Sequence, residues 1–483
     1  MIPSGDYIRI LPELVLIVFG VIVMLIEATL DAQNDRRSLG AIAFVGVLAS
    51  LAATAFQFNY QGTAFSGVVR VDGFSIFFHF VVGLVSLLVI LASLEYLAVQ
   101  GIRAGEYYAL ILLGTVGMML MSSAVELVLV FISLEISSIA TYVLAGFRRR
   151  SATSIESSLK YFLLGSFATS FFLYGVAMMF GATGTTNVYA IGEKLAGGTP
   201  TLAYVAMALM FVGLGFKVAT APFHVWTPDV YEGAPSPVVA LMSTAPKAAT
   251  FAVMLRILFA AVPVARPEWF WLVWVSAVLS MFLGNIGALV QTSIKRMLAY
   301  SSIAHAGYIL VAFAAMPDLG ISAAMFYAAS YAVMNAGAFL VISHFGALNE
   351  RYVTLEDYAG LGRRQPLLAA TLTVFLLSLI GIPITGGFLA KFYVFTAALK
   401  ANLVGLVVLG VINSAIASYY YLRVIVYMYM RDPREGVEPA PATRIPVSLG
   451  VSLALSVIVV IYLGVLPGNV LDFAISSAQQ MLR

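Results

Sequence analysis

The most constraining feature of this sequence is the recurrence of long apolar runs along nearly its whole length. A helix of about 20 apolar residues crosses the hydrocarbon core of a bilayer. The chain is 61% hydrophobic and only 10% charged, whereas soluble proteins are about 45–50% apolar and about 25% charged. The sequence therefore predicts an all-α membrane protein. Fourteen runs predict spanning helices: 11–30, 38–56, 73–98, 107–122, 125–146, 155–181, 202–232, 235–260, 269–291, 296–315, 319–347, 366–400, 403–430 and 446–466.

Two of these runs are too long for one straight helix, and each contains helix breakers. The seventh run contains Thr220-Ala221-Pro222, and the twelfth contains Pro383 between Gly381 and Gly387. Proline removes a helical donor and clashes with the preceding turn. Irregular backbone at membrane depth is tolerated only where it is buried in protein or lines a watery cavity. We therefore expect helices 7 and 12 to be broken and to mark the interior.

Lysine and arginine are divided unevenly between the loops. Loops after odd-numbered spans carry fourteen basic residues, and the other loops with the two termini carry six. The positive-inside rule then places the odd-numbered loops in the cytoplasm of a bacterial inner membrane and both termini in the periplasm. The first residues lack a basic n-region and a cleavage site, so the first run is expected to remain a membrane helix. The fourteen are Arg36, Arg37, Arg103, Arg148, Arg149, Arg150, Lys295, Arg296, Arg351, Arg363, Arg364, Arg431, Arg434 and Arg444.

A short motif occurs twice. Helix 5 contains Ser137-Ser138-Ile139-Ala140, and helix 10 contains Ser301-Ser302-Ile303-Ala304. The two broken spans are also five spans apart. Because five is odd, a tandem five-helix repeat inserts in opposite orientations, as in many secondary transporters. The sequence predicts inverted repeats of helices 4–8 and 9–13, with four segments: 1–106 (helices 1–3), 107–260 (first repeat), 261–430 (second repeat) and 431–483 (helix 14).

Charged residues inside the spans are the candidates for function. A charge at the centre of a membrane helix costs about 2.5–3.5 kcal/mol on insertion scales, so it is functional by default. Burial disfavours the charged form of a lysine and a nearby carboxylate favours it, so a buried lysine can take up and release a proton. Four of the seven lysines fall inside predicted spans: Lys160, Lys217, Lys247 and Lys391.

Each candidate also has a structural interpretation. Glu135, near the middle of helix 5, is either a proton-transfer acid or half of a fixed ion pair. Lysines near a helix end extend their charge to the surface, and this alternative competes with function most strongly at Lys160. Histidine titrates near neutral pH, so His224 and His305 either relay protons or only form buried hydrogen bonds. The set predicted to translocate protons is Glu135, Lys160, Lys217, His224, Lys247, His305 and Lys391.

Cofactor chemistry is not indicated in this chain. It has no cysteine, its four histidines are far apart, and neither a Walker A sequence nor G-x-G-x-x-G after a strand occurs. We therefore expect no metal, NADH, flavin or ATP site, and energy must come from a partner or an ion gradient. A net charge of +3 gives no reason to expect nucleic acid.

Several segments resemble a known family, the antiporter-like membrane subunits of proton-pumping NADH–quinone oxidoreductase (respiratory complex I). The similarity covers nearly the whole chain, is strongest around helix 7, and is greatest to the N type, because M-type subunits carry glutamate at the place of Lys391 and the chain lacks the long lateral helix of the L type. The segments are Lys160 to Ser166, Phe216 to Gly233, Lys295 to His305 and Gly381 to Phe392.

The resemblance implies a role for each charged residue. Glu135 and Lys217 match the family's glutamate–lysine pair, Lys247 the central lysine, Lys391 the charge of the second half-channel and Lys160 an additional lysine. NADH, FMN, iron–sulfur clusters and quinone are then expected in partner subunits. Expected neighbours are the antiporter-like M and L and the small K and J subunits. This makes the chain part of an enzyme without a redox centre of its own.

The sequence leaves three alternative hypotheses for the function of the chain. The chain could belong to a multisubunit cation/proton antiporter or to a membrane-bound energy-converting hydrogenase. It could also be a scaffold whose charges only fix helix packing. Replacing Lys217 separates the scaffold from the transporters, because a scaffold would leave pumping unchanged.

Overall fold

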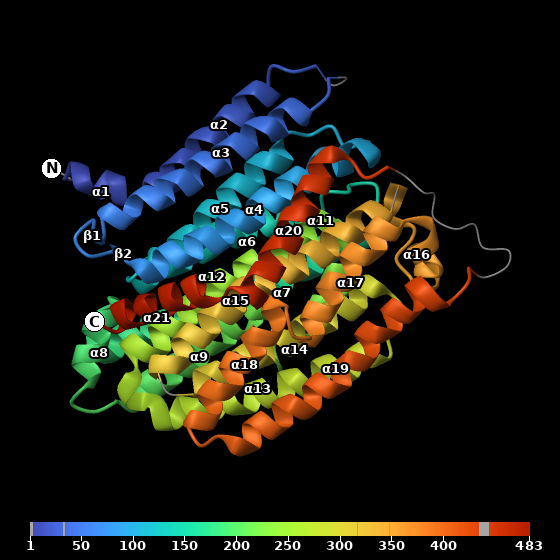
Figure 1. Ribbon diagram of the computed structural model, residues 1–483. Helices are drawn as coiled ribbons and strands as arrows, with labels where there is room; N and C mark the ends of the chain where they lie inside the picture. The colour runs from blue at the N-terminus through green and yellow to red at the C-terminus, as the bar shows by residue number, and fades with distance from the viewer. Residues whose placement is uncertain (1–2, 32–33, 316, 347, 434–443) are drawn as a thin grey trace.

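The computed structural model describes the whole chain except residues 1–2, 32–33, 316, 347 and 434–443, so Arg434 lies outside the described residues. Long helices run side by side at a common tilt, and both termini lie at the same end of the bundle (Figure 1). The expected all-α membrane architecture is confirmed, with one short hairpin as its only sheet among the described residues.

The helices match the predicted runs closely, with short extra helices at the ends of the bundle. In chain order they are α1 (Ser4–Arg9), α2 (Leu11–Glu27), α3 (Arg37–Phe56), α4 (Gly73–Val99), α5 (Glu106–Ser123), α6 (Leu127–Ala145), α7 (Ala152–Thr183), α8 (Val188–Leu195), α9 (Thr201–Val218), α10 (Thr227–Gly233), α11 (Ser236–Met242), α12 (Ala245–Arg256), α13 (Arg266–Leu289), α14 (Ile294–Ala314), α15 (Pro317–Phe345), α16 (Leu361–Arg364), α17 (Pro366–Ile380), α18 (Gly386–Lys400), α19 (Val404–Met430), α20 (Val447–Val465) and α21 (Gly468–Leu482).

Twelve helices in the described part of the chain are long and apolar enough to cross a membrane. Two of the fourteen expected spans are not among them, and the reason is length. Helix α2 has 17 residues, and the run 366–400 is divided into α17 and α18, each of 15 residues. The last helix, α21, was not anticipated as a separate element.

Both expected breaks are present. Helix α9 ends at Val218 and the chain resumes as α10 at Thr227, with Ala219 at a φ of 61°. Helix α17 ends at Ile380, and Gly381 adopts a φ of 92°, which glycine tolerates because it has no Cβ.

A third break interrupts the eighth run, which we expected to be continuous. Helix α11 ends at Met242 and α12 begins at Ala245, with Thr244 between them far from helical geometry. The cause is Pro246, which has no N–H to donate to the Met242 carbonyl and whose ring clashes with the preceding turn. This break places Lys247 in the first turn of α12.

The core lies around α11, α12, α14 and α15. The most apolar windows of the eighth run and of α15 are completely buried, whereas those of α7, α19 and α20 are less than 40% buried. A helix that is apolar on all sides belongs inside a bundle. The buried charges therefore lie on or beside the innermost helices.

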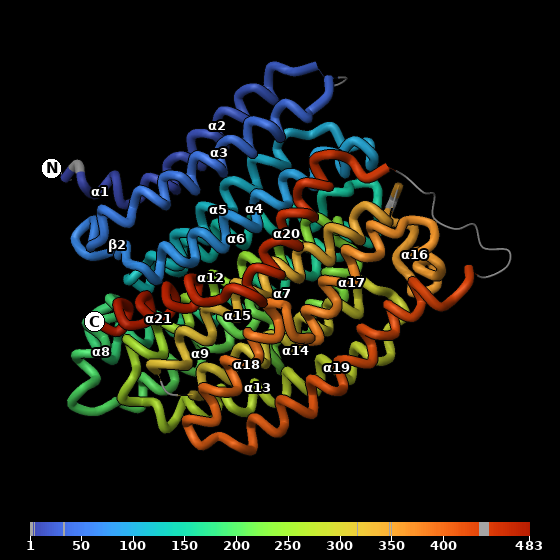
Figure 2. Tube along the Cα trace, viewed as in Figure 1, coloured from blue at the N-terminus to red at the C-terminus, as the bar shows by residue number. Residues whose placement is uncertain are grey.

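The two ends of the bundle differ in composition. One end, here called the hairpin end, carries α1, the hairpin of β1 (Gly62–Ala64) and β2 (Val69–Val71), α8 and the end of α21 (Figures 1 and 2). The other, here called the arginine-rich end, carries α16 and the loops after α2, α4 and α6. Loops that lie at the arginine-rich end are 28–36, 100–105, 146–151, 290–293, 346–365 and 431–446, apart from the undescribed residues in them.

Candidate proton-translocation site

Lys217 is almost completely buried, with 3% of its surface exposed, in the last turn of α9 before the break. Its ammonium donates to the Ser138 hydroxyl of α6 at 2.9 Å and to the Tyr161 hydroxyl of α7 at 3.2 Å. The ring of Tyr142 lies 5.6 Å away. Neutral hydroxyls thus hold this lysine, and no carboxylate among the described residues forms an ion pair with it.

Glu135 lies on α6 three residues before Ser138, so the two share a helix face that Lys217 approaches. Its Oε1 atom is buried and has no hydrogen-bond partner among the described residues. A buried polar atom without a partner costs free energy, so such an atom calls for an explanation. Glu135 and Lys217 therefore meet the same face of α6, but no ion pair between them is present among the described residues.

The freed backbone groups of the first break are bonded by protein. The Trp226 indole donates to the Phe216 carbonyl at 3.0 Å. Two serines of α13 bond the backbone of Ala221. The Ser280 hydroxyl accepts from the Ala221 N–H at 2.8 Å, and the Ser276 hydroxyl donates to the Ala221 carbonyl at 2.7 Å. These bonds fix the break rigidly beside Lys217.

Aromatic rings fill the space between Lys217 and Lys247. Tyr161 stacks on Trp226 with ring centroids 4.5 Å apart, and Trp226 meets Tyr231 at 5.9 Å. The Lys247 ammonium lies 5.9 Å from the Tyr231 ring centroid. Two lysines from different helices are thus joined by a chain of rings, two of which carry hydroxyl groups.

One face of α14 connects Lys247 with Lys391. Lys247, 2% exposed, hydrogen-bonds to the Ser302 hydroxyl. One turn further along the same face lies His305, and one turn beyond it Tyr308, whose ring centroid is 4.9 Å from the Lys391 ammonium. Residues three apart on a helix are neighbours on its surface. Helix α14 therefore presents a hydroxyl, an imidazole and a phenol in sequence between the two lysines.

His305 is hydrogen-bonded through both ring nitrogens. Nδ1 lies 2.8 Å from the Tyr327 hydroxyl and Nε2 lies 3.2 Å from the Tyr421 hydroxyl, which also bonds Ser301. Because each hydroxyl can donate or accept, the imidazole can exchange its tautomer without losing a bond. This is what a proton relay requires, and it is also compatible with a fixed buried histidine.

Lys391 lies on α18, 6% exposed, beside the second break. Its ammonium donates to the Ile380 carbonyl at 2.8 Å, the Leu379 carbonyl at 3.2 Å and the Ser414 hydroxyl at 2.9 Å. The carbonyls that the break frees at the end of α17 are therefore bound by the lysine itself.

Two candidates lie outside this row. The Lys160 side chain is 41% exposed at the arginine-rich end and pairs with Glu156 at 2.7 Å and Asp229 at 2.9 Å, so it resembles a surface ion pair. Arg296 also pairs with Asp229, at 2.7 Å. His224 is half-buried in the first break, with Nδ1 lacking a hydrogen-bond partner among the described residues.

Sequence reasoning missed a buried ion cluster at the arginine-rich end. Glu350 accepts from Lys295 at 2.7 Å, from the Ser236 N–H at 2.6 Å and from the Tyr96 hydroxyl at 2.8 Å, with Arg148 at 3.5 Å. Burial acts to raise the pKa of Glu350, but the charges of Lys295 and Arg148 and these hydrogen bonds lower it to about 2. Lys295 and Arg148, counted from sequence as loop charges, are internal partners instead.

Two hydroxyls that hold lysines were also missed, although the sequence contained the signal. Ser138 bonds Lys217 and Ser302 bonds Lys247, and these are the matching second serines of the repeated Ser-Ser-Ile-Ala motif. In the sequence, the repeat predicts only topology. Equivalent positions in the two motifs perform the same task, which the pattern alone could have suggested.

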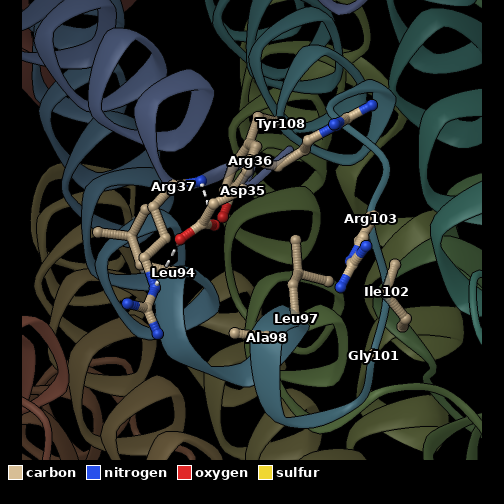
Figure 3. Close-up of a pocket in the computed structure, with 10 residues that line it drawn as sticks. All are labelled: Asp35, Arg36, Arg37, Leu94, Leu97, Ala98, Gly101, Ile102, Arg103 and Tyr108. Carbon is tan, nitrogen blue, oxygen red and sulfur yellow. Dashed lines mark hydrogen bonds and ion pairs between the residues drawn. The ribbon is translucent and has the colours of Figure 1, made fainter. Parts of the chain in front are cut away.

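Two cavities lie at the arginine-rich end, and a third borders the first break, where Phe216 and Trp226 line it. One of about 270 Å³ at the arginine-rich end is lined by Asp35, Arg36, Arg37, Arg103 and Tyr108, among others (Figure 3). Its neighbour of about 730 Å³ is lined by Arg148, Arg149 and Arg150. No cluster of three or more metal-binding side chains occurs in the described part of the chain.

A family model described as the membrane part of NADH:quinone oxidoreductase and Mrp antiporters matches residues 124–417. The chain belongs to this family. All of the predicted residues, from Glu135 to Lys391, lie inside the matched segment.

Related proteins extend the family match to the full length. NADH-quinone oxidoreductase subunit N 2 of Koribacter versatilis is 64% identical over 100% of this chain and 99% of its own. A chain of respiratory complex I from Thermus thermophilus is 37% identical, with a TM-score of 0.81, covering 95% of this chain and 98% of that one. A chain of an archaeal membrane-bound sulfane sulfur reductase is 25% identical with a TM-score of 0.88, covering 98% of both. The antiporter-like fold is therefore shared by complexes of different chemistry.

Proposed function

We propose that this chain is the N-type antiporter-like subunit of a bacterial NADH–quinone oxidoreductase and that it moves protons across the membrane. The observation that carries the proposal is the row of buried groups Lys217, Lys247, His305 and Lys391, with the half-buried Glu135 on the helix face that Lys217 approaches. The names of its full-length relatives support the choice of complex. A row of three buried lysines has no structural need of its own, because each charge is costly in lipid.

The row works as a sequence of proton-binding groups. When ionised Glu135 approaches Lys217, its charge holds the proton on the lysine. When Glu135 moves away, Lys217 is left with only neutral partners in a buried site and releases its proton towards Lys247. From there Ser302 and His305 lead to Lys391. His224 lies beside the first step, and Lys160 with Asp229 supplies protons at the arginine-rich end.

The energy and the redox chemistry belong to other chains in this proposal. NADH, FMN, iron–sulfur clusters and quinone bind to partner subunits, which is consistent with a sequence that has no cysteine. The neighbours in the membrane are the antiporter-like M and L and the small K and J subunits. Their redox-driven movements bias the position of Glu135.

The same proposal includes the topology. Helix α2 and the α17–α18 pair each form a span, which gives fourteen. The segments 107–260 and 261–430 are inverted repeats flanked by 1–106 and 431–483. Support comes from the two breaks five spans apart and from the paired roles of Ser138 and Ser302. The arginine-rich end is cytoplasmic and both termini are periplasmic, in the bacterial inner membrane.

The function is tested by Glu135→Gln in the assembled complex. This variant keeps the shape of the side chain but removes the charge that holds the proton on Lys217. We expect NADH-driven proton pumping into proteoliposomes to fall by about a hundredfold, as for loss of a positioned proton-transfer group. Glu135→Asp keeps the charge and should lose much less.

The matched control is Glu193→Gln, which removes an exposed acid from α8, away from the row. If the complex with Glu135→Gln assembled and pumped protons normally, Glu135 would have only a packing role. Pumping without NADH, driven by a sodium gradient, would instead favour the cation/proton antiporter.

The topology is tested by single cysteines in this cysteine-free chain. Arg149 lies in the loop before α7, and Gly197 lies between α8 and α9, where an added Cβ has no neighbour within 4 Å. We expect an impermeant thiol reagent to label Arg149→Cys only from the cytoplasm and Gly197→Cys only from the periplasm. Labelling of both from one side would contradict the proposed topology.

A further inference from the structure

A second pair of buried titratable groups lies outside both the lysine row and the segment matched by the family model. Glu13, in the first turn of α2, is 2% exposed, and His79 of α4 is completely buried. The Glu13 Oε1 atom lies 3.6 Å from His79 Nε2. Both residues are in the half of the bundle next to the hairpin end.

The pair is poorly satisfied by its surroundings. Both carboxylate oxygens of Glu13 and Nδ1 of His79 are buried without a hydrogen-bond partner among the described residues, as is Oε1 of Gln57 nearby in the chain after α3. Buried polar atoms are nearly always bonded, and exceptions are explained by function or by bound water. Four such atoms at one end of four helices are therefore a signal of a site.

One hydrogen bond among the described residues fixes the imidazole. His79 Nε2 lies 3.1 Å from the Met119 carbonyl of α5, so Nε2 carries a hydrogen and donates it. That carbonyl also accepts from the hydroxyls of Ser122 at 2.8 Å and Ser123 at 3.3 Å. Since a carbonyl oxygen has two lone pairs, the histidine N–H can leave it for Glu13 at little cost.

Apart from Asp72 at the start of α4, whose charge acts on His79, no charge among the described residues of the surrounding helices compensates the pair. The remaining titratable groups of α2 to α5 lie towards the opposite end: Glu27, Arg37, Glu95, Glu106, Tyr96, Tyr107 and Tyr108. At the hairpin end, Asp6 pairs with Arg9, and Asp72 pairs with Arg256 and Arg70. The nearby charges are thus already paired with each other.

This arrangement restricts the number of protons. Without the proton, the pair would consist of an ionised Glu13 and a neutral His79, which leaves an uncompensated negative charge in an apolar site. With a second proton, Glu13 would be neutral and His79 would be an uncompensated imidazolium. A single shared proton makes the pair neutral overall, whichever residue holds it. We propose that Glu13 and His79 form a proton-binding site that holds one proton and exchanges it with water at the hairpin end.

Polar side chains lie on both sides of the Glu13–His79 site. Towards the hairpin end, Gln57 donates to the Arg9 carbonyl at 2.7 Å, which places one polar side chain at that end. Towards the interior, α4 carries Ser86 and Ser93 at successive steps of seven from His79, and they bond Thr115 and Tyr107 of α5 at 2.7 and 2.9 Å. The site therefore ends a polar seam between α4 and α5.

The test uses the assembled complex in membranes and infrared difference spectra recorded between acidic and alkaline pH. The variants are Glu13→Gln, His79→Gln and the double substitution, with Glu95→Gln as the control, an acid that pairs with Arg37 at the other end of α4. We expect Glu13→Gln to remove one titrating carboxyl band and His79→Gln to shift its titration. Glu95→Gln should leave that band unchanged.

Proton pumping supplies a second readout. Because both residues share one proton, each single substitution should lower the ratio of pumped protons to oxidised NADH by a similar factor, and the double substitution should lower it no further. Unchanged infrared titration in Glu13→Gln, or additive losses in the double variant, would overturn the proposal. The infrared result does not depend on the lysine row, so failure here is distinguishable from failure of the proposed function.

Discussion

Proton pumping is expected to fall about a hundredfold when Lys217 is replaced by alanine, the loss typical of removing a positioned proton-transfer group. The complex should still assemble, since the partners of Lys217 are the neutral hydroxyls of Ser138 and Tyr161, which can bond a water in its place. The measurement is the initial rate of NADH-driven acidification in proteoliposomes. NADH oxidation is expected to fall with pumping if the two are tightly coupled.

Lys217→Arg makes the same test sharper. Arginine keeps the positive charge and the hydrogen bonds but does not release its proton under physiological conditions. A proton carrier is therefore lost in both variants, whereas a fixed packing charge is lost only in Lys217→Ala. Lys194→Ala, in the last turn of α8, is the control lysine. Normal pumping by Lys217→Arg would show that only the charge matters at this position.

The largest effect on stability is expected at Glu350. Replacing it with alanine leaves Lys295, which is 1% exposed, as a buried cation, and removes the acceptor of Tyr96 and of the Ser236 N–H. Breaking a buried ion pair by removing one partner costs about 3–5 kcal/mol. The midpoint temperature at which the chain dissociates from the solubilised complex should fall accordingly. Glu356→Ala, near the exposed end of α19, is the control.

The pH dependence of this contribution follows from the sign of the shift. The pKa of Glu350 is lowered to about 2 in the folded chain, so its contribution is present above the ordinary carboxyl range and is lost as the pH falls towards 2. The difference in midpoint temperature between the native chain and Glu350→Ala should therefore stay constant from about pH 6 to 8. A difference that vanished within this range would contradict the ion cluster.

Long periodic features were predictable from the sequence, and short-range packing was not. The apolar runs located nearly all the long helices, because length and hydropathy alone decide what can cross a bilayer. Pro222 and Pro383 indicated two breaks correctly. The third, before Pro246, was missed because its run had the ordinary length of a single span.

In the candidate site, too, some residues could be predicted from the sequence and others depended on tertiary packing. Lys217, Lys247 and Lys391 could be found because lysine is conspicuous among apolar residues. Lys160 resembled them in sequence, but its four-carbon chain reaches Glu156 and Asp229 at the surface. Lys295 looked like a loop residue and is buried, because its partner Glu350 comes from a segment 55 residues away. Such a pairing depends on tertiary contacts that no local pattern contains.

The three helix breaks also arrange partial charges. Each half-helix has its own dipole, equivalent to roughly half a negative charge at its carboxyl end and half a positive charge at its amino end. Lys217 belongs to the carboxyl end of α9, and Lys391 binds the carbonyls at the carboxyl end of α17. Lys247 instead sits in the first turn of α12, at an amino end. The backbone therefore favours a resting proton on the two outer lysines and opposes one on the middle lysine, so that in the proposed pathway Lys247 is a barrier that a proton crosses rather than a place where it waits.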